Sequence, residues 1–182
     1  MKRTIIVFGL IAGVIMSVIM DVTVIYIGDV GFDSSMIIGY TTMVAAFLLI
    51  YFGIRSYRDN VAGGYLSFGR GFVVGLGIVL VASLLYVASW DFVYRRYIPD
   101  FGERYTAYML DEARKSGKSD AELLKMRAEA DKTWESYKNP LVRAAYTIVE
   151  PLPVGLVITL ISAGILRKKR KEEPVIAERM AG

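Results

Sequence analysis

Charged residues are absent from four long stretches of the chain, and these stretches predict the fold. Residues 4–20, 34–54, 71–90 and 151–166 contain no Asp, Glu, Lys or Arg. At a rise of about 1.5 Å per residue, a helix over residues 34–54 spans about 31 Å, close to the ~30 Å hydrocarbon core of a bilayer. With flanking apolar residues included, the pattern predicts transmembrane helices at about 4–27, 34–54, 71–94 and 141–166.

The first predicted helix follows the basic pair Lys2-Arg3, as the apolar core of a cleaved signal peptide also would. Its apolar run is too long for such a peptide, and no small-x-small cleavage motif follows it. We therefore expect a retained transmembrane helix that continues past Asp21. Residues 28–35, rich in Gly, Asp and Ser, predict a tight turn before the second helix.

One long polar segment, residues 95–140, separates the third predicted helix from the fourth. Ser119 and Glu122 form a capping-box pattern in it, and Gly117 marks the end of the preceding helix. We predict an amphipathic helical hairpin at about 99–138. Its apolar stripe consists of Phe101, Tyr105, Met109, Leu123, Met126, Trp134 and Tyr137. These side chains are expected to pack between the two helices, to lie on the lipid surface, or to receive a partner protein.

Together these elements predict an all-α integral membrane protein, a four-helix bundle with an extramembrane amphipathic hairpin between the third and fourth spans. We expect a single membrane domain over residues 1–182, with a basic tail at 167–182. Glycine and other small residues recur four apart in three of the spans, which allows helices to approach closely. They are expected to pack the bundle itself or, as the alternative, to form a homo-oligomer.

Composition narrows the possible functions. The chain has no Cys and no His, which removes disulfides, the commonest metal ligand and the commonest general base. Its glycines form no phosphate-binding fingerprint after a strand. We therefore expect neither an enzyme nor a metal or cofactor site. The net charge of +4 is small, and nucleic acid is not an expected partner.

A basic cluster directly after the fourth span provides the orientation signal. It consists of Arg167, Lys168, Lys169, Arg170 and Lys171. Such clusters stop translocation on the cytoplasmic side and attract anionic lipid headgroups. We expect a multi-pass protein of the bacterial inner membrane, with both termini in the cytoplasm, the hairpin outside and membrane lipids as partners.

Three acidic residues lie near the hairpin ends of the spans, namely Asp21, Asp91 and Glu150. Asp21 and Glu150 are expected several ångströms inside the hydrocarbon, and at the bilayer centre a carboxylate costs about 2.5–3.5 kcal/mol on the insertion scale. The three carboxylates are a candidate proton or cation site, with carbonyls freed by Pro151 and Pro153 as further ligands. Alternatively they are interfacial carboxylates, with Asp91 paired to Arg95 and Glu150 to Arg143.

Several short motifs occur in an order that identifies a family. They are 53–59 (GIRSYRD), 67–72 (SFGRGF), 97–101 (YIPDF), 137–140 (YKNP) and 153–156 (PVGL). In this combination the chain resembles the bacterial membrane proteins grouped as Domain of Unknown Function 4199, over nearly its whole length. The resemblance implies a four-helix integral membrane protein of Gram-negative bacteria. It implies no reaction and no catalytic residue.

Two functions follow from these expectations. The first is a non-enzymatic structural or accessory protein whose outward hairpin docks an envelope partner. The second is a small oligomeric transporter, or a proton- or cation-coupled channel, that uses Glu150, Asp21 and Asp91.

Overall fold

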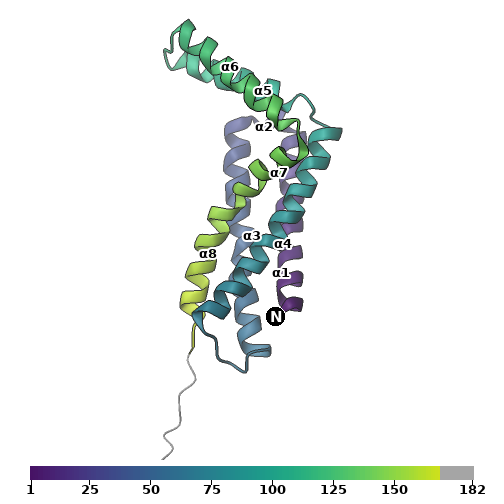
Figure 1. The fold of residues 1–182 in the computed structure, drawn as a ribbon, viewed down its shortest axis with the longest axis vertical. Coiled ribbons are helices and arrows are strands. Elements are labelled where there is room, and N and C mark those ends of the chain that lie inside the picture. The colour runs from purple at the N-terminus through teal and green to yellow at the C-terminus, as the bar shows by residue number, and fades with distance from the viewer. Residues whose placement is uncertain (169–182) are drawn as a thin grey trace, which may run out of the picture.

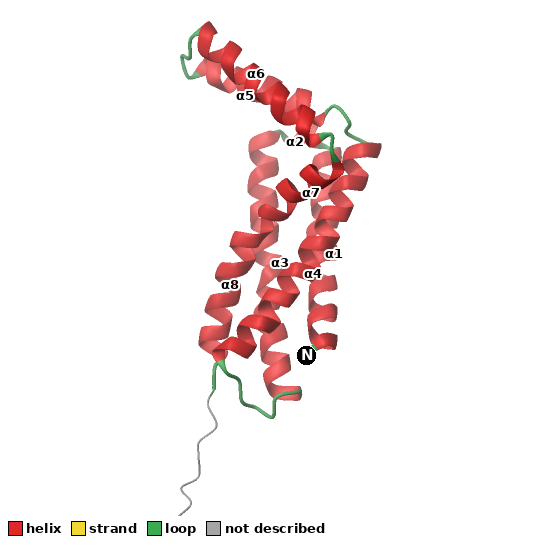
Figure 2. Cartoon of the chain, in the orientation of Figure 1, coloured by secondary structure: helices red, strands yellow, loops and turns green. Residues whose placement is uncertain are grey.

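The computed structural model describes residues 1–168, and in that part the secondary structure is helical apart from short loops and one isolated bridge between Leu66 and Lys168 (Figures 1 and 2). Three residues of the basic cluster predicted to contact lipid headgroups, Lys169, Arg170 and Lys171, lie outside the described residues. The helices in chain order are α1 (Lys2–Ile25), α2 (Ile27–Val30), α3 (Phe32–Asn60), α4 (Phe68–Arg96), α5 (Phe101–Lys115), α6 (Asp120–Tyr137), α7 (Pro140–Val149) and α8 (Pro151–Leu166).

Four helical segments are long and apolar enough to cross a membrane: α1, α3, α4, and α7 with α8 over Pro140–Leu166. The predicted all-α bundle is confirmed. However, α3 and α4 extend past the predicted spans into charged sequence, because backbone hydrogen bonds continue a helix without help from apolar side chains. The predicted tight turn at 28–35 is also wrong in detail, since it contains the single turn α2, and only Gly31, at φ +81°, breaks the helix before α3.

Small residues set the helix spacing in the bundle. A Cβ atom on Gly13 would lie 3.1 Å from the Ala82 backbone, so Gly13 lets α1 approach α4 closely. On the other side of α4, a Cβ on Gly75 would lie 2.6 Å from Thr159 of α8. The small residues predicted from sequence thus serve packing within the chain, in agreement with the first of the two expectations.

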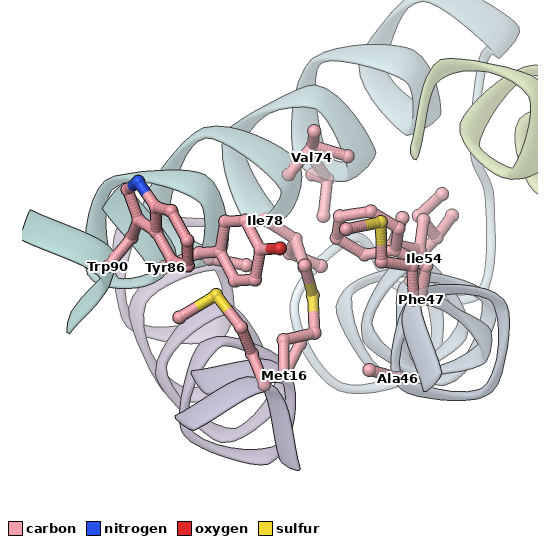
Figure 3. Packing of buried hydrophobic residues seen from close by; sticks show 14 of the residues in the cluster. Met16, Ala46, Phe47, Ile54, Val74, Ile78, Tyr86 and Trp90 are labelled. Atoms are coloured by element: carbon pink, nitrogen blue, oxygen red, sulfur yellow. The ribbon is translucent and has the colours of Figure 1, made fainter. Parts of the chain in front are cut away.

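The bundle core is mostly apolar. Met16, Phe47 and Ile78 converge from α1, α3 and α4 and are at most 1% exposed (Figure 3). The outward faces are apolar as well, with Leu84 62% and Ile165 67% exposed. Continuous apolar exposure of this kind suits a surface that faces lipid, because a water-soluble bundle would carry polar side chains there.

The fourth span is interrupted at Glu150. Pro151 and Pro153 have no N–H, so the carbonyls of Thr147 and Val149 lack their usual donors four residues on. The chain bends there between α7 and α8 (Figure 1). As a result α8 packs against α3 and α4, whereas α7 packs against α4 and α6 and diverges from α3.

The polar hairpin consists of α5 and α6 and leans across one end of the bundle (Figure 1). Gly117, at φ +81°, ends the first helix. The predicted capping box is present, since Ser119 N–H donates to Glu122 Oε2 at 2.9 Å and Ser119 Oγ accepts from Glu122 N–H at 3.4 Å. We call the end of the bundle beneath α5 and α6 the hairpin end, and the opposite end the tail end.

Candidate functional site

Aromatic side chains dock the hairpin on the bundle. The ring of Phe101 packs edge-on against Trp90 of α4, with centroids 5.2 Å apart. Trp90 Nε1 donates a 2.7 Å hydrogen bond to the hydroxyl of Tyr137 in α6. Phe32, the first residue of α3, stacks on Tyr108 at 4.9 Å. The hairpin therefore contacts the ends of α3 and α4 directly.

Arg143 in α7 fastens the same region by its charge. Its side chain is 2% exposed. The guanidinium forms an ion pair with Asp91 of α4 and donates a 3.0 Å hydrogen bond to the carbonyl of Tyr137. It also lies 4.7 Å from the ring centroid of Tyr94, a cation–π contact. One buried arginine thus joins α4, the end of α6 and α7.

A cavity of about 590 Å³ lies between the docked hairpin and the hairpin end of the bundle. Its lining comes from α1 to α4, both hairpin helices, α7 and the α7–α8 junction. The lining residues are Met20, Thr23, Val24, Ile27, Phe32, Ser35, Met36, Gly39, Tyr86, Trp90, Phe101, Tyr105, Thr133, Trp134, Tyr137, Tyr146, Thr147 and Glu150. This volume falls in the range of small-molecule binding pockets, about 300–1,000 Å³.

The cavity is closed toward the tail end and open at the side. One helical turn deeper than its lining, Met16, Met43 and Ala82 are at most 1% exposed, so buried side chains fill the bundle below the cavity. At the side, Met36 of α3 is 52% exposed and Tyr146 of α7 is 57% exposed. Because α3 diverges from α7 here, the opening faces the surroundings of the bundle at the level of the hairpin-end half of the helices.

Glu150 is the one carboxylate in the cavity lining. Its Oε2 accepts a 3.2 Å hydrogen bond from the hydroxyl of Tyr86 in α4. The expected pairing of Glu150 with Arg143 is wrong, because Arg143 turns toward Asp91 instead. Residues 143 and 150 are two helical turns apart, so the two side chains can share a helix face without the guanidinium reaching the Glu150 carboxylate.

The other two acids of the candidate proton or cation site lie elsewhere. Asp21 accepts a 2.7 Å hydrogen bond from Ser89 Oγ, while its Oδ1 is buried without a hydrogen-bond partner. Asp91 forms ion pairs with Arg143 and, as expected, with Arg95. Within residues 1–168, no group of three or more carboxylates could hold a metal ion. The structure therefore does not bring Asp21, Asp91 and Glu150 together.

The apolar stripe of the hairpin divides into two parts. Phe101, Tyr105, Trp134 and Tyr137 line the cavity. Gly102 permits this packing, since a Cβ there would lie 2.7 Å from the Trp134 ring. Farther along the hairpin, Leu123 is buried, whereas Met109 and Met126 border a separate groove of about 300 Å³ with Tyr105 and Trp134.

The described part of the basic cluster lies at the tail end. Arg167 and Lys168 are exposed, and the backbone of Lys168 pairs with Leu66 in the loop between α3 and α4, with N···O distances of 2.8 and 2.9 Å. A headgroup contact remains a prediction. Arg167 and Lys168 directly follow α8, the last helix of the fourth candidate span.

Sequence reasoning missed Tyr86 and Trp90 as cavity residues. Tyr86 lies in an uncharged run that resembles any other span, and Trp90 ends the same run. One signal was available, because a Tyr within a span needs a hydrogen-bond partner and a Glu at the same depth can supply it. Burial raises the pKa of Tyr137, so this cavity phenol stays protonated to a higher pH than an exposed tyrosine would.

Comparisons with known proteins agree with this architecture. Residues 7–168 match the family model described as "Protein of unknown function (DUF4199)". No curated protein and no solved structure matched the chain. The match covers all four candidate spans from residue 7 onward as well as the hairpin. The chain therefore belongs to the DUF4199 family.

Proposed function

We propose that the protein is a non-enzymatic accessory protein of the bacterial inner membrane that binds a hydrophobic or amphipathic molecule in the cavity beneath its hairpin. The cavity itself supports this proposal most directly. It is large enough for a small ligand, mostly apolar, and open toward the region that lipid would occupy.

A binding role fits this arrangement better than a channel. A channel needs a continuous polar path, and the tail-end half of the bundle is filled by apolar side chains such as Phe47 and Ile78. A relay of the three acids would need them within reach of one another, yet Asp91 is already paired with two arginines. Transport would require a second conformation in which the core opens.

Both tryptophans of the chain, Trp90 and Trp134, line the cavity, so tryptophan fluorescence reports on it directly. We expect a neutral brominated monoacylglycerol to quench this fluorescence saturably when the protein is held in phosphatidylcholine nanodiscs. Gly39→Phe should abolish saturable quenching, because Gly39 lines the cavity and a Cβ there meets nothing within 4 Å. The bulky ring would thus occupy ligand space without a clash.

Gly164→Phe is the matched control. Gly164 is also helical, partly exposed and free of neighbours within 4 Å of a Cβ, but it lies in α8 away from the cavity. This variant should retain saturable quenching. Quenching that rises linearly with probe concentration in the unaltered protein would refute a binding cavity. Equal quenching in the two variants would refute it as well.

A second candidate function is the docking of an envelope protein on the far part of the hairpin. The groove bordered by Met109 and Met126 supports it, because methionine-lined grooves suit helical partners and no other part of the described chain fills this one. A photo-crosslinker at Met126 should then capture one defined protein in native membranes. Replacing Met109 with Asp should abolish that product, and an unchanged product would exclude this surface.

A further inference from the structure

The chemistry of the cavity specifies what kind of molecule would fit it. Its lining combines one carboxylate with eight aromatic rings and contains no Lys or Arg. The basic residue nearest in sequence, Arg143, already pairs with Asp91 and with backbone carbonyls. The charge of an ionised Glu150 is therefore not balanced by any basic side chain of the lining.

Glu150 has capacity for another partner. Among the described residues its one hydrogen bond is the donation from Tyr86 to Oε2. Oε1 accepts no hydrogen bond and is not among the fully buried polar atoms without partners. A ligand group in the cavity can therefore reach this oxygen, beside the phenol that already orients the carboxylate.

Aromatic side chains that line the same cavity as this carboxylate contact one another. Trp90 contacts Phe101 at 5.2 Å, and Trp134 contacts Tyr137 at 5.2 Å between ring centroids. Tyr137 in turn lies 5.9 Å from Tyr146. Ring faces attract organic cations, and cages that combine aromatic rings with a carboxylate recognise ammonium groups.

An inorganic cation fits the same site poorly. Calcium takes six to eight oxygen ligands and magnesium an octahedral set, whereas this cavity provides one carboxylate and scattered hydroxyls. An anionic headgroup would meet the carboxylate without any basic side chain to offset the repulsion. The remaining match is a cation whose charge is spread over an organic group and whose body is apolar.

We propose that the cavity binds an amphipathic organic cation, with its ammonium group at Glu150 among the aromatic rings and its apolar tail leaving between α3 and α7. This proposal rests on the proposed binding function and adds the chemical class of the ligand. The side opening bordered by Met36 and Tyr146 accepts a tail without displacing any buried residue.

The test compares three brominated single-chain amphiphiles of equal length in the nanodisc quenching experiment: a trimethylammonium, the neutral monoacylglycerol and a sulfate. We expect the ammonium to bind about tenfold more tightly than the neutral probe, and the sulfate to bind more weakly than both. Glu150→Gln should remove the preference for the ammonium over the neutral probe. If this variant does not fold, the relative affinities of the three probes for the unaltered protein still test the proposal.

Asp21→Asn is the control, because Asp21 is a second half-buried acid near the hairpin end that does not line the cavity. It should keep the ammonium preference. Equal affinity of the unaltered protein for ammonium and neutral probes would overturn the proposal, as would a preference that survives in Glu150→Gln. Failure of the neutral probe to bind would instead reject the binding function itself, so the two failures are distinguishable.

Discussion

Arg143 is the one charged side chain among the fully buried residues of the described chain. Burying a charge is costly unless it is paired, and Asp91 and the carbonyl of Tyr137 supply the pairing. Arg143 lies in α7, and its contacts with Asp91 and Tyr137 link this helix to α4 and α6. At this position its long side chain reaches all three.

Arg143→Met should destabilise the protein by about 3–5 kcal/mol, because it leaves Asp91 without its buried partner. A large drop in the thermal unfolding midpoint in detergent would reveal this. Arg95→Met provides the comparison, since Arg95 pairs with the same aspartate but is 65% exposed, and its loss should cost about 1 kcal/mol or less. Similar drops in the two variants would contradict a special role for the buried arginine.

At the scale of elements, the hairpin is attached at two places. Its base is held by the aromatic contacts of Phe101 and Tyr137 with Trp90. Further along α5, the hydroxyl of Tyr108 donates to the carboxylate of Asp33 in the first turn of α3. The second attachment is exposed to water and titratable, whereas the first is buried.

The hydrogen bond to Asp33 raises the pKa of Tyr108 from its ordinary 10.0 to about 12. A raised pKa in the folded protein means that this contact stabilises docking fully below pH 10 and is lost as the pH rises through about 12, when the phenolate can no longer donate. Ultraviolet titration of the protein minus that of Tyr108→Phe should show this late transition. Asp33→Asn should move it back toward the ordinary value, and an unmoved transition would exclude the contact.

The helix pair at the fourth span shows what sequence reasoning can and cannot supply for an element. Pro151 and Pro153 indicated irregular backbone, and α7 and α8 do separate there. The direction of the bend, which moves α7 away from α3 and opens the cavity, depends on which neighbours each half contacts. No local pattern contains that information.

At the scale of the whole molecule, the hairpin lies at one end of the bundle, and Arg167 and Lys168, the described part of the basic cluster, lie at the other (Figure 1). If the cluster faces the cytoplasm, the hairpin lies outside the membrane. The loop between α3 and α4 must then lie on the cytoplasmic side with the cluster, because Leu66 pairs with Lys168.

The absence of native cysteine allows this orientation to be tested with single substitutions. A membrane-impermeant maleimide should label Glu129→Cys, on the exposed face of α6, in intact spheroplasts. It should label Val61→Cys, in the exposed loop after α3, only after permeabilisation. The unaltered protein should not be labelled, and the reverse pattern would invert the topology.

From its sequence alone, this protein is determined to be helical, to have four segments of membrane-spanning length and to carry a capped hairpin between the last two. Hydrophobic length, capping residues and helix-breaking glycines are local properties, so they can be read along the chain. Which charges pair, where Glu150 points and whether the aromatic stripe meets itself or the bundle were decided by tertiary structure. Those outcomes depend on residues far apart in the chain, such as Asp33 and Tyr108, which are 75 positions apart and become neighbours only when the hairpin folds back over the helices.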